Sequence, residues 1–190
     1  MNKWEYLKRG AINMKQTNES SEIVLNLDDN VLDFVNQEIK NTDNIEKIVK
    51  EKIELIIDTL IRQENVYAEK IYVSIESATK DEIKQVNKEY RSIDKYTDVL
   101  SFPIFSREEI VGFSKNTVEM KEIDLGDIIV CLDVVKEQSI EYNTGILREL
   151  LYMITHATCH LLGYDHEIES DKITMRKVEE SVLNKLGVNR

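Results

Sequence analysis

Short apolar segments that suit β-strands alternate along this chain with longer segments of helical periodicity, and this alternation limits the fold more than any other feature. The strand candidates cover residues 23–27, 70–75, 98–102 and 127–132. Residues 127–132 are the most hydrophobic of them, so we expect this strand to be central in the sheet. Four strands interleaved with helices predict an α/β or α+β layer fold.

Several helices can be placed from their periodicity and their start signals. Thr79 followed by Glu82 forms a capping box, and Asp133 and Thr144 are expected to cap the next two helices. Residues 106–122 are charged and weakly patterned, so we expect a loop there. The expected helices cover residues 45–62, 79–90, 133–142, 144–162 and 170–186.

Length and composition indicate one soluble domain. A chain of 190 residues can bury a core without disulfides, and we expect residues 21–190 to form a single domain behind a mobile leader over residues 1–20. The two cysteines suggest no disulfide framework, and no apolar stretch is long enough to span a membrane, so we expect a cytoplasmic protein. The net charge of −11 opposes non-specific binding to nucleic acid, so such a role needs a local basic patch.

All three histidines of the chain lie in one segment, His156-Ala-Thr-Cys-His160-Leu-Leu-Gly163-Tyr-Asp-His166. His156 and His160 are four residues apart, so on a helix they share a face and can reach one ion. Gly163 can end that helix in a left-handed turn, which lets His166 approach from a third direction. Three imidazoles with an open fourth position are typical of a catalytic zinc site. The segment therefore predicts one bound Zn²⁺ ion at the end of this helix, in a site that nickel and copper also suit.

A single histidine in a protein more often lies hydrogen-bonded in the core or solvated on the surface than bound to a metal. Projection of the helix at 100° per residue puts His156 and His160 on one stripe with Glu149 and Met153, away from the core face. The core face is formed by Leu147, Leu150, Leu151, Ile154, Thr158 and Leu161. Two histidines on a shared stripe and a third beyond a glycine favour the metal site over that ordinary role.

Two neighbours of the histidines have two interpretations each. Cys159 is a potential zinc ligand, but it projects away from the histidine pair, so we interpret it as a packing residue. Asp165 either orients an imidazole from behind or forms the turn that precedes His166.

The histidine spacing matches the metzincin protease pattern H-E-x-x-H-x-x-G-x-x-H except at one position. Ala157 stands where that pattern has the glutamate that serves as general base, and Glu149 lies too far along the helix to replace it. Without this carboxylate the usual route of peptide hydrolysis lacks its proton acceptor. A metalloprotease therefore remains only as an alternative.

Two further segments accompany the histidine segment, Tyr90-Arg91-Ser-Ile-Asp-Lys-Tyr-Thr-Asp98-Val-Leu-Ser-Phe-Pro103 and Leu125-Gly-Asp-Ile-Ile-Val130. In this order and spacing, the three segments resemble the YbeY family of bacterial endoribonucleases, also described as ribosomal RNA maturation factors. The resemblance covers the chain from about residue 23 to its end. Ala157 and Cys159 are small departures, because the family often has Gly or Ser at the first position and Leu at the second.

The resemblance implies a mixed β-sheet packed with helices and a zinc-dependent enzyme that cuts single-stranded RNA. It also implies a role in small-subunit ribosomal RNA maturation and ribosome quality control, with the ribosome or its proteins as further partners. Within it, His156, His160 and His166 bind the metal, and Arg91 contributes to the RNA site as a phosphate anchor. A basic patch near Arg91 is expected from Lys84, Lys88 and Lys95.

Other interpretations of these residues stay open. An arginine at a helix end and lysines on a helix face are commonly no more than solvated charges. A non-catalytic, ribosome-associated binding factor, in which zinc only pins a helix to the following loop, is the second alternative to an endoribonuclease.

Overall fold

The structure of the chain is a computed structural model that describes residues 21–40, 42–116, 120–166 and 168–188. The mobile leader expected over residues 1–20 lies outside the described residues. Among those that are described, none of the helices combines the length and apolarity that a membrane span requires.

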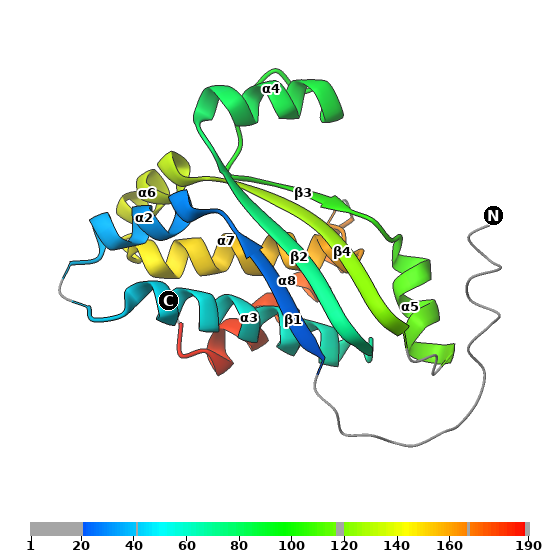
Figure 1. The fold of residues 1–190 in the computed structure, drawn as a ribbon. Helices are drawn as coiled ribbons and strands as arrows, with labels where there is room; N and C mark the ends of the chain where they lie inside the picture. The colour runs from blue at the N-terminus through cyan, green and yellow to red at the C-terminus, as the bar shows by residue number, and fades with distance from the viewer. Residues whose placement is uncertain (1–20, 41, 117–119, 167, 189–190) are drawn as a thin grey trace.

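A four-stranded mixed sheet forms the centre of the fold, in the order β1-β2-β4-β3 (Figure 1). β1 pairs with β2 and β2 with β4 in parallel, whereas β3 pairs with β4 in antiparallel orientation. The strands are β1 (Glu22–Leu27), β2 (Ala68–Ala78), β3 (Val99–Pro103) and β4 (Met120–Cys131). The expected α/β class with a mixed four-stranded sheet is therefore confirmed, and the most hydrophobic strand candidate lies in central strand β4, where Ile128 and Val130 are fully buried.

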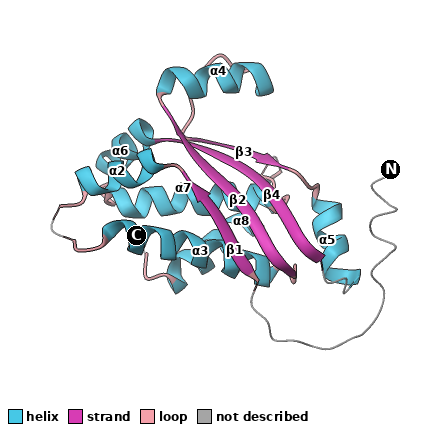
Figure 2. Ribbon diagram, viewed as in Figure 1, coloured by secondary structure: helices cyan, strands magenta, loops and turns pink. Residues whose placement is uncertain are grey.

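Seven helices accompany the sheet in the described part of the chain (Figure 2). α3, α7 and α8 lie on one side of the sheet, and α4 contacts β2, β3 and β4 from outside this layer. Their bounds are α2 (Asp29–Glu38), α3 (Ile45–Gln63), α4 (Lys80–Arg91), α5 (Arg107–Asn116), α6 (Leu132–Glu141), α7 (Ile146–Leu161) and α8 (Glu169–Lys185). The capping box of Thr79 and Glu82 at the start of α4 is confirmed.

Other details of the helices differ from the sequence-based expectation. The loop expected over residues 106–122 is wrong, because α5 and the start of β4 occupy it. The missed start signal is a capping box: the Glu109 carboxylate accepts from the Ser106 amide at 3.0 Å, and the Ser106 hydroxyl accepts from the Glu109 amide at 3.3 Å. The caps of α6 and α7 are Cys131 and Gly145 instead of Asp133 and Thr144. α2 was not expected from the sequence.

α7 is buried on nearly all of its sides. It contacts β3 and β4 on the sheet and α3, α6 and α8 among the helices. The expectation that Glu149 and Met153 lie off the core face is wrong, because each is only 1% exposed. α8 adds a second covered face, which the periodicity of α7 alone does not reveal. His156 and His160 lie at the partly exposed end of this helix.

Gly126 allows β3 and β4 to pair closely. Its φ is +121°, and a Cβ added to it would lie 2.1 Å from the carbonyl oxygen of Phe102. Any side chain at this position would collide with the backbone of β3. This collision explains why the segment at 125–130 has a glycine here.

Asp28 joins the end of β2 to the start of α2. Its carboxylate caps α2 by accepting from the Asn30 amide at 2.9 Å, and it also accepts from the amide and hydroxyl of Ser77. Burial raises the pKa of Asp28, but the hydrogen bonds from Ser77 and Asn30 outweigh burial and lower the pKa to about 2. The ionised carboxylate therefore stabilises the folded chain.

We predict that Asp28→Ala lowers the free energy of unfolding by about 1–2 kcal/mol at neutral pH, as expected for loss of a helix cap. Because the folded-state pKa is depressed, this stabilisation is present above the ordinary value of 3.8 and is lost as pH falls through about 2. Urea unfolding at several pH values measures the difference. Asp33→Ala, an exposed change on the same helix, is the control. A difference between wild type and Asp28→Ala that stayed constant down to about pH 2 would contradict this account.

Candidate metal centre

The end of α7 turns back on itself at Gly163. The Tyr164 amide donates to the Cys159 carbonyl at 3.0 Å, and the Gly163 amide donates to the His160 carbonyl at 2.9 Å, which is a Schellman motif. Gly163 has a φ of +76°, and a Cβ added to it would lie 2.6 Å from Cα of Arg107 at the start of α5. The expected left-handed turn is confirmed, and its glycine also permits close contact with α5.

The turn brings the three histidines together. One ring nitrogen from each of His156, His160 and His166 lies within 4.8 Å of those of the other two. Nε2 of His156 and Nε2 of His160 are 3.2 Å apart, and the ring of His166 lies 5.1 Å from that of His160 between centroids. Two of the rings are partly buried at the end of α7, and the third is exposed on the loop. The group therefore combines a rigid pair with one ligand from a connecting segment.

The other ring nitrogens of the helical pair are held by acceptors. Nδ1 of His156 donates to Oε1 of Glu179 on α8 at 2.7 Å, and Nδ1 of His160 donates to the Tyr164 carbonyl at 2.8 Å. Protons on both Nδ1 atoms leave lone pairs on the two Nε2 atoms, which face each other. Two facing lone pairs repel unless a cation lies beside both, so this donor set fits a metal ion.

Protonation also favours ligation by His160 and disfavours it by Cys159. Burial, followed by the neighbouring His156, lowers the pKa of His160 to about 4, so its ring is neutral at physiological pH. Burial raises the pKa of Cys159 well above its usual value, and nearby Glu179 and Glu64 add to this effect. Cys159 is fully buried as a neutral thiol, in agreement with its interpretation as a packing residue.

Side chains beside the histidines have distinct roles. Glu149 is buried and binds the side chains of Thr144 and Arg148, so its carboxylate is engaged away from the histidines. Asp165 accepts from the amide of the next residue, His166, at 2.7 Å. Sequence reasoning missed Glu179 and the Tyr164 carbonyl as the groups that orient the rings. Glu179 lies on another helix with no motif around it, and a backbone carbonyl has no sequence signal.

Arg91, the expected phosphate anchor, lies at the last position of α4 and is exposed. Its Nη2 donates to the Ser101 carbonyl of β3 at 3.1 Å, which holds the guanidinium beside that strand. This bond uses one of the five N–H groups of a guanidinium. β3 in turn packs against α7, so Arg91 is tied to a strand that contacts the histidine helix.

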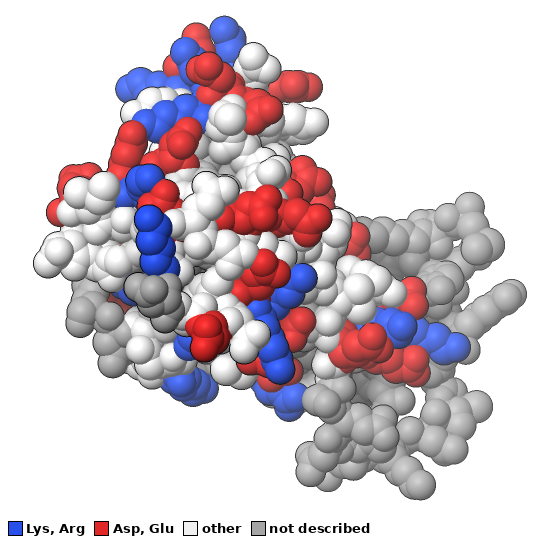
Figure 3. Space-filling model, turned by 60° about the vertical axis from the view of Figure 1, so that its left-hand side comes forward, with Lys and Arg blue, Asp and Glu red and all other residues white. Residues whose placement is uncertain are grey.

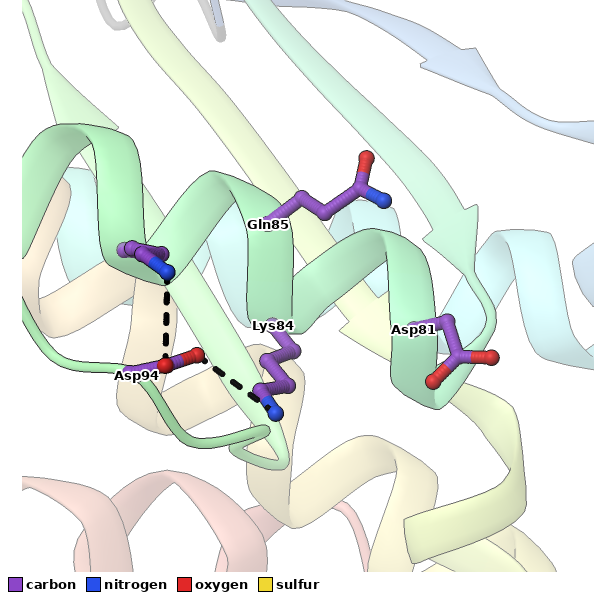
Figure 4. Close-up of a pocket in the computed structure, with 5 residues that line it drawn as sticks. Asp81, Lys84, Gln85 and Asp94 are labelled. Carbon is purple, nitrogen blue, oxygen red and sulfur yellow. Dashed lines mark hydrogen bonds and ion pairs between the residues drawn. The ribbon is translucent and has the colours of Figure 1, made fainter.

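The lysines near Arg91 form a mixed rather than a purely basic surface. Asp94 pairs with Lys84 at 3.4 Å and with Lys88 at 3.3 Å, in a hollow of the surface along α4 (Figure 4). Lys95 is exposed, and its backbone carbonyl accepts from the Asn87 side chain at 2.8 Å. On the face that Figure 3 shows, acidic and basic side chains are interspersed. Asp94 therefore offsets part of the positive charge expected here.

A family model described as endoribonuclease YbeY matches residues 33–187. The chain belongs to the YbeY family. The match includes α7, the histidine turn and the whole of α8, so all of the residues that form the candidate metal centre lie within it.

Similar members of the YbeY family come from several bacteria. "Endoribonuclease YbeY" of Clostridioides difficile (strain 630) is 46% identical over 101 residues, 53% of this chain. The protein of the same name from Caldanaerobacter subterraneus subsp. tengcongensis is 45% identical over 102 residues, also 53% of this chain. The chain spans 62% and 65% of the lengths of these two relatives. The solution structure of TM1509 from Thermotoga maritima is 26% identical, with a TM-score of 0.47, over 86% of this chain and 90% of that one.

We predict that Glu179→Gln weakens zinc affinity by about 10- to 100-fold, because the charged acceptor that orients His156 is lost while its shape is kept. Competition with a chromophoric chelator measures the affinity. Glu180→Gln is the matched control, since its neighbouring carboxylate pairs with Arg176 on the exposed side of α8. Equal affinities in the two variants would show that the bond to Glu179 does not tune the metal centre.

Proposed function

We propose that this chain is a zinc-dependent endoribonuclease specific for single-stranded RNA, acting as a single domain over residues 21–190. His156, His160 and His166 bind one Zn²⁺ ion, and Arg91 anchors a phosphate of the RNA. The observation that carries the proposal is the convergence of the three histidines, two of whose rings are oriented by Glu179 and the Tyr164 carbonyl, in a member of the YbeY family. The relatives named above are called endoribonucleases.

The chemistry of the site suits phosphodiester hydrolysis. A zinc ion held by neutral imidazoles lowers the pKa of water to about 7 and acts as a Lewis acid toward a phosphoryl oxygen. Glu179 and the Tyr164 carbonyl keep the imidazoles of the helical pair in the tautomer that presents Nε2. Arg91 supplies a planar, permanently charged group whose N–H donors match two phosphate oxygens at once.

Ribosomal RNA is the substrate that we propose, in small-subunit maturation and ribosome quality control, with the ribosome or its proteins as further partners. This part of the proposal is supported by the resemblance of the segments at 90–103, 125–130 and 156–166 to the family. We place this activity in the cytoplasm. The free, buried state of both Cys131 and Cys159 agrees with a reducing compartment.

A metalloprotease of the metzincin type is less well supported. Ala157 occupies the position of its general base and is fully buried in the core, and Glu149 is engaged elsewhere. Glu179 contacts His156 through Nδ1, on the side of the ring away from the facing Nε2 atoms. A peptidase assay with metal-dependent cleavage would revive this alternative.

We predict that the purified chain binds about one zinc ion and that His160→Ala loses both stoichiometric zinc and RNA cleavage. Removal of a Lewis acid worth several kcal/mol lowers the rate by on the order of a hundredfold or more. Metal analysis is combined with cleavage assays on a single-stranded RNA and on its duplex. As a control, chelation and readdition of zinc should abolish and restore cleavage by the wild type. Full cleavage by His160→Ala would refute the proposal.

We predict that Arg91→Ala lowers RNA cleavage by about 10- to 100-fold, the effect of one lost charge-assisted phosphate contact. Zinc content and melting temperature should stay unchanged, because Arg91 is exposed. Its hydrogen bond goes to the Ser101 carbonyl and not to any of the three histidines. Arg176→Ala, an exposed arginine on α8, is the matched control. If the wild type bound zinc and RNA but did not cleave RNA, the ribosome-associated binding factor would be the better interpretation.

A further inference from the structure

We propose that Glu64, Arg107 and Tyr164 form a clamp that positions His166 for metal binding, an inference that rests on the proposed metal centre. His166 is exposed and lies beyond the end of α7, so helix geometry does not place it as it places His156 and His160. Its approach to the other two rings depends on the path of residues 163–166. The clamp holds this path from two other elements of the fold.

Glu64 is the first member of the clamp. It follows the last residue of α3, and its side chain is only 10% exposed. Oε1 accepts from the Tyr164 hydroxyl, and Oε2 accepts from Nη1 of Arg107 at 2.5 Å. Both oxygens of one largely buried carboxylate are therefore used to join the end of α3 to the loop after α7 and to the start of α5.

Arg107 closes the clamp from α5. Its Nη1 also donates to the Leu162 carbonyl at 3.1 Å, and its guanidinium lies 4.4 Å from the centroid of the Tyr164 ring. The absence of a side chain on Gly163 allows the backbone of Arg107 to come this close. One arginine thus contacts the end of α7 and the carboxylate of Glu64 through Nη1, and the Tyr164 ring of the loop through the face of its guanidinium.

Tyr164 passes the effect of the clamp to the histidines. Its ring is held by Glu64 and Arg107, while its backbone carbonyl accepts from Nδ1 of His160 at 2.8 Å. Tyr164 is also only two residues before His166 in the chain. When the ring of Tyr164 is held in place, its carbonyl is held in position to orient His160. The direction in which the chain leaves Tyr164 toward His166 is then also fixed. Glu64, Arg107 and Tyr164 are positioning residues, because they act through the histidines.

Tyr164→Phe and Glu64→Gln test the clamp while keeping the shape of each side chain. We expect each to weaken zinc affinity by about 10- to 100-fold, as other changes behind metal ligands do, and to alter the visible spectrum of the cobalt-substituted protein. Asp58→Asn is the matched control, because it breaks an exposed ion pair with Arg62 on the same helix, α3. A purely structural role would lower the melting temperature but leave zinc affinity and the cobalt spectrum unchanged, and that result would overturn the clamp.

A double-mutant cycle with His166→Ala shows whether the clamp acts through the third ligand. We expect the loss in affinity from Tyr164→Phe to be much smaller in the His166→Ala background, whereas two fully additive losses would overturn the inference. If wild type bound no zinc, or His160→Ala bound it equally well, the proposed function and the clamp would both fail. If wild type bound zinc through the histidines and the clamp variants bound it as tightly, the clamp alone would fail.

Discussion

Burial of α7 among β3, β4, α3, α6 and α8 is the constraint on which the candidate metal centre depends. A helix packed on so many sides cannot rotate about its axis without disturbing the core, so the directions of His156 and His160 are set by packing. The Schellman motif then ends the helix at a defined residue and reverses the chain. The positions of His156 and His160 follow from this packing, and Gly163 permits the turn that brings His166 back toward them.

The groups behind the histidines come from distant parts of the chain. Glu179 reaches His156 from α8, and the Tyr164 carbonyl reaches His160 from the loop. Glu64 and Arg107 add contacts from α3 and α5 to the same loop. Orientation of a metal site by such surroundings reduces the conformational freedom that would otherwise be lost on binding. The contacts that hold α3, α5 and α8 in the fold therefore also orient the histidines.

One residue separates this site from a protease site of the same histidine spacing. Ala157 projects into the core, fully buried, where a glutamate would have to be desolvated or turned toward the histidines. The acidic groups near the histidines are engaged in other contacts, since Glu179 accepts from His156 and Asp165 accepts from the His166 amide. The histidine face is thereby left free of acidic side chains from these positions, and Arg91, at the end of α4 and bonded to the Ser101 carbonyl of β3, offers a cation suited to a phosphate.

The sequence by itself determined the strands, most of the helices and the convergence of the three histidines, because these follow from local periodicity and from the conformations open to glycine at 163. It missed α2 and α5, although the capping box of Ser106 and Glu109 marks the start of α5. It placed Glu149 and Met153 off the core face because periodicity reveals only one covered face of a helix, whereas α7 has two. Only the tertiary structure decided which groups hold the ligands. Glu179, Glu64 and Arg107 are ordinary charged residues in the sequence, and their roles arise from contacts between elements that lie far apart along the chain.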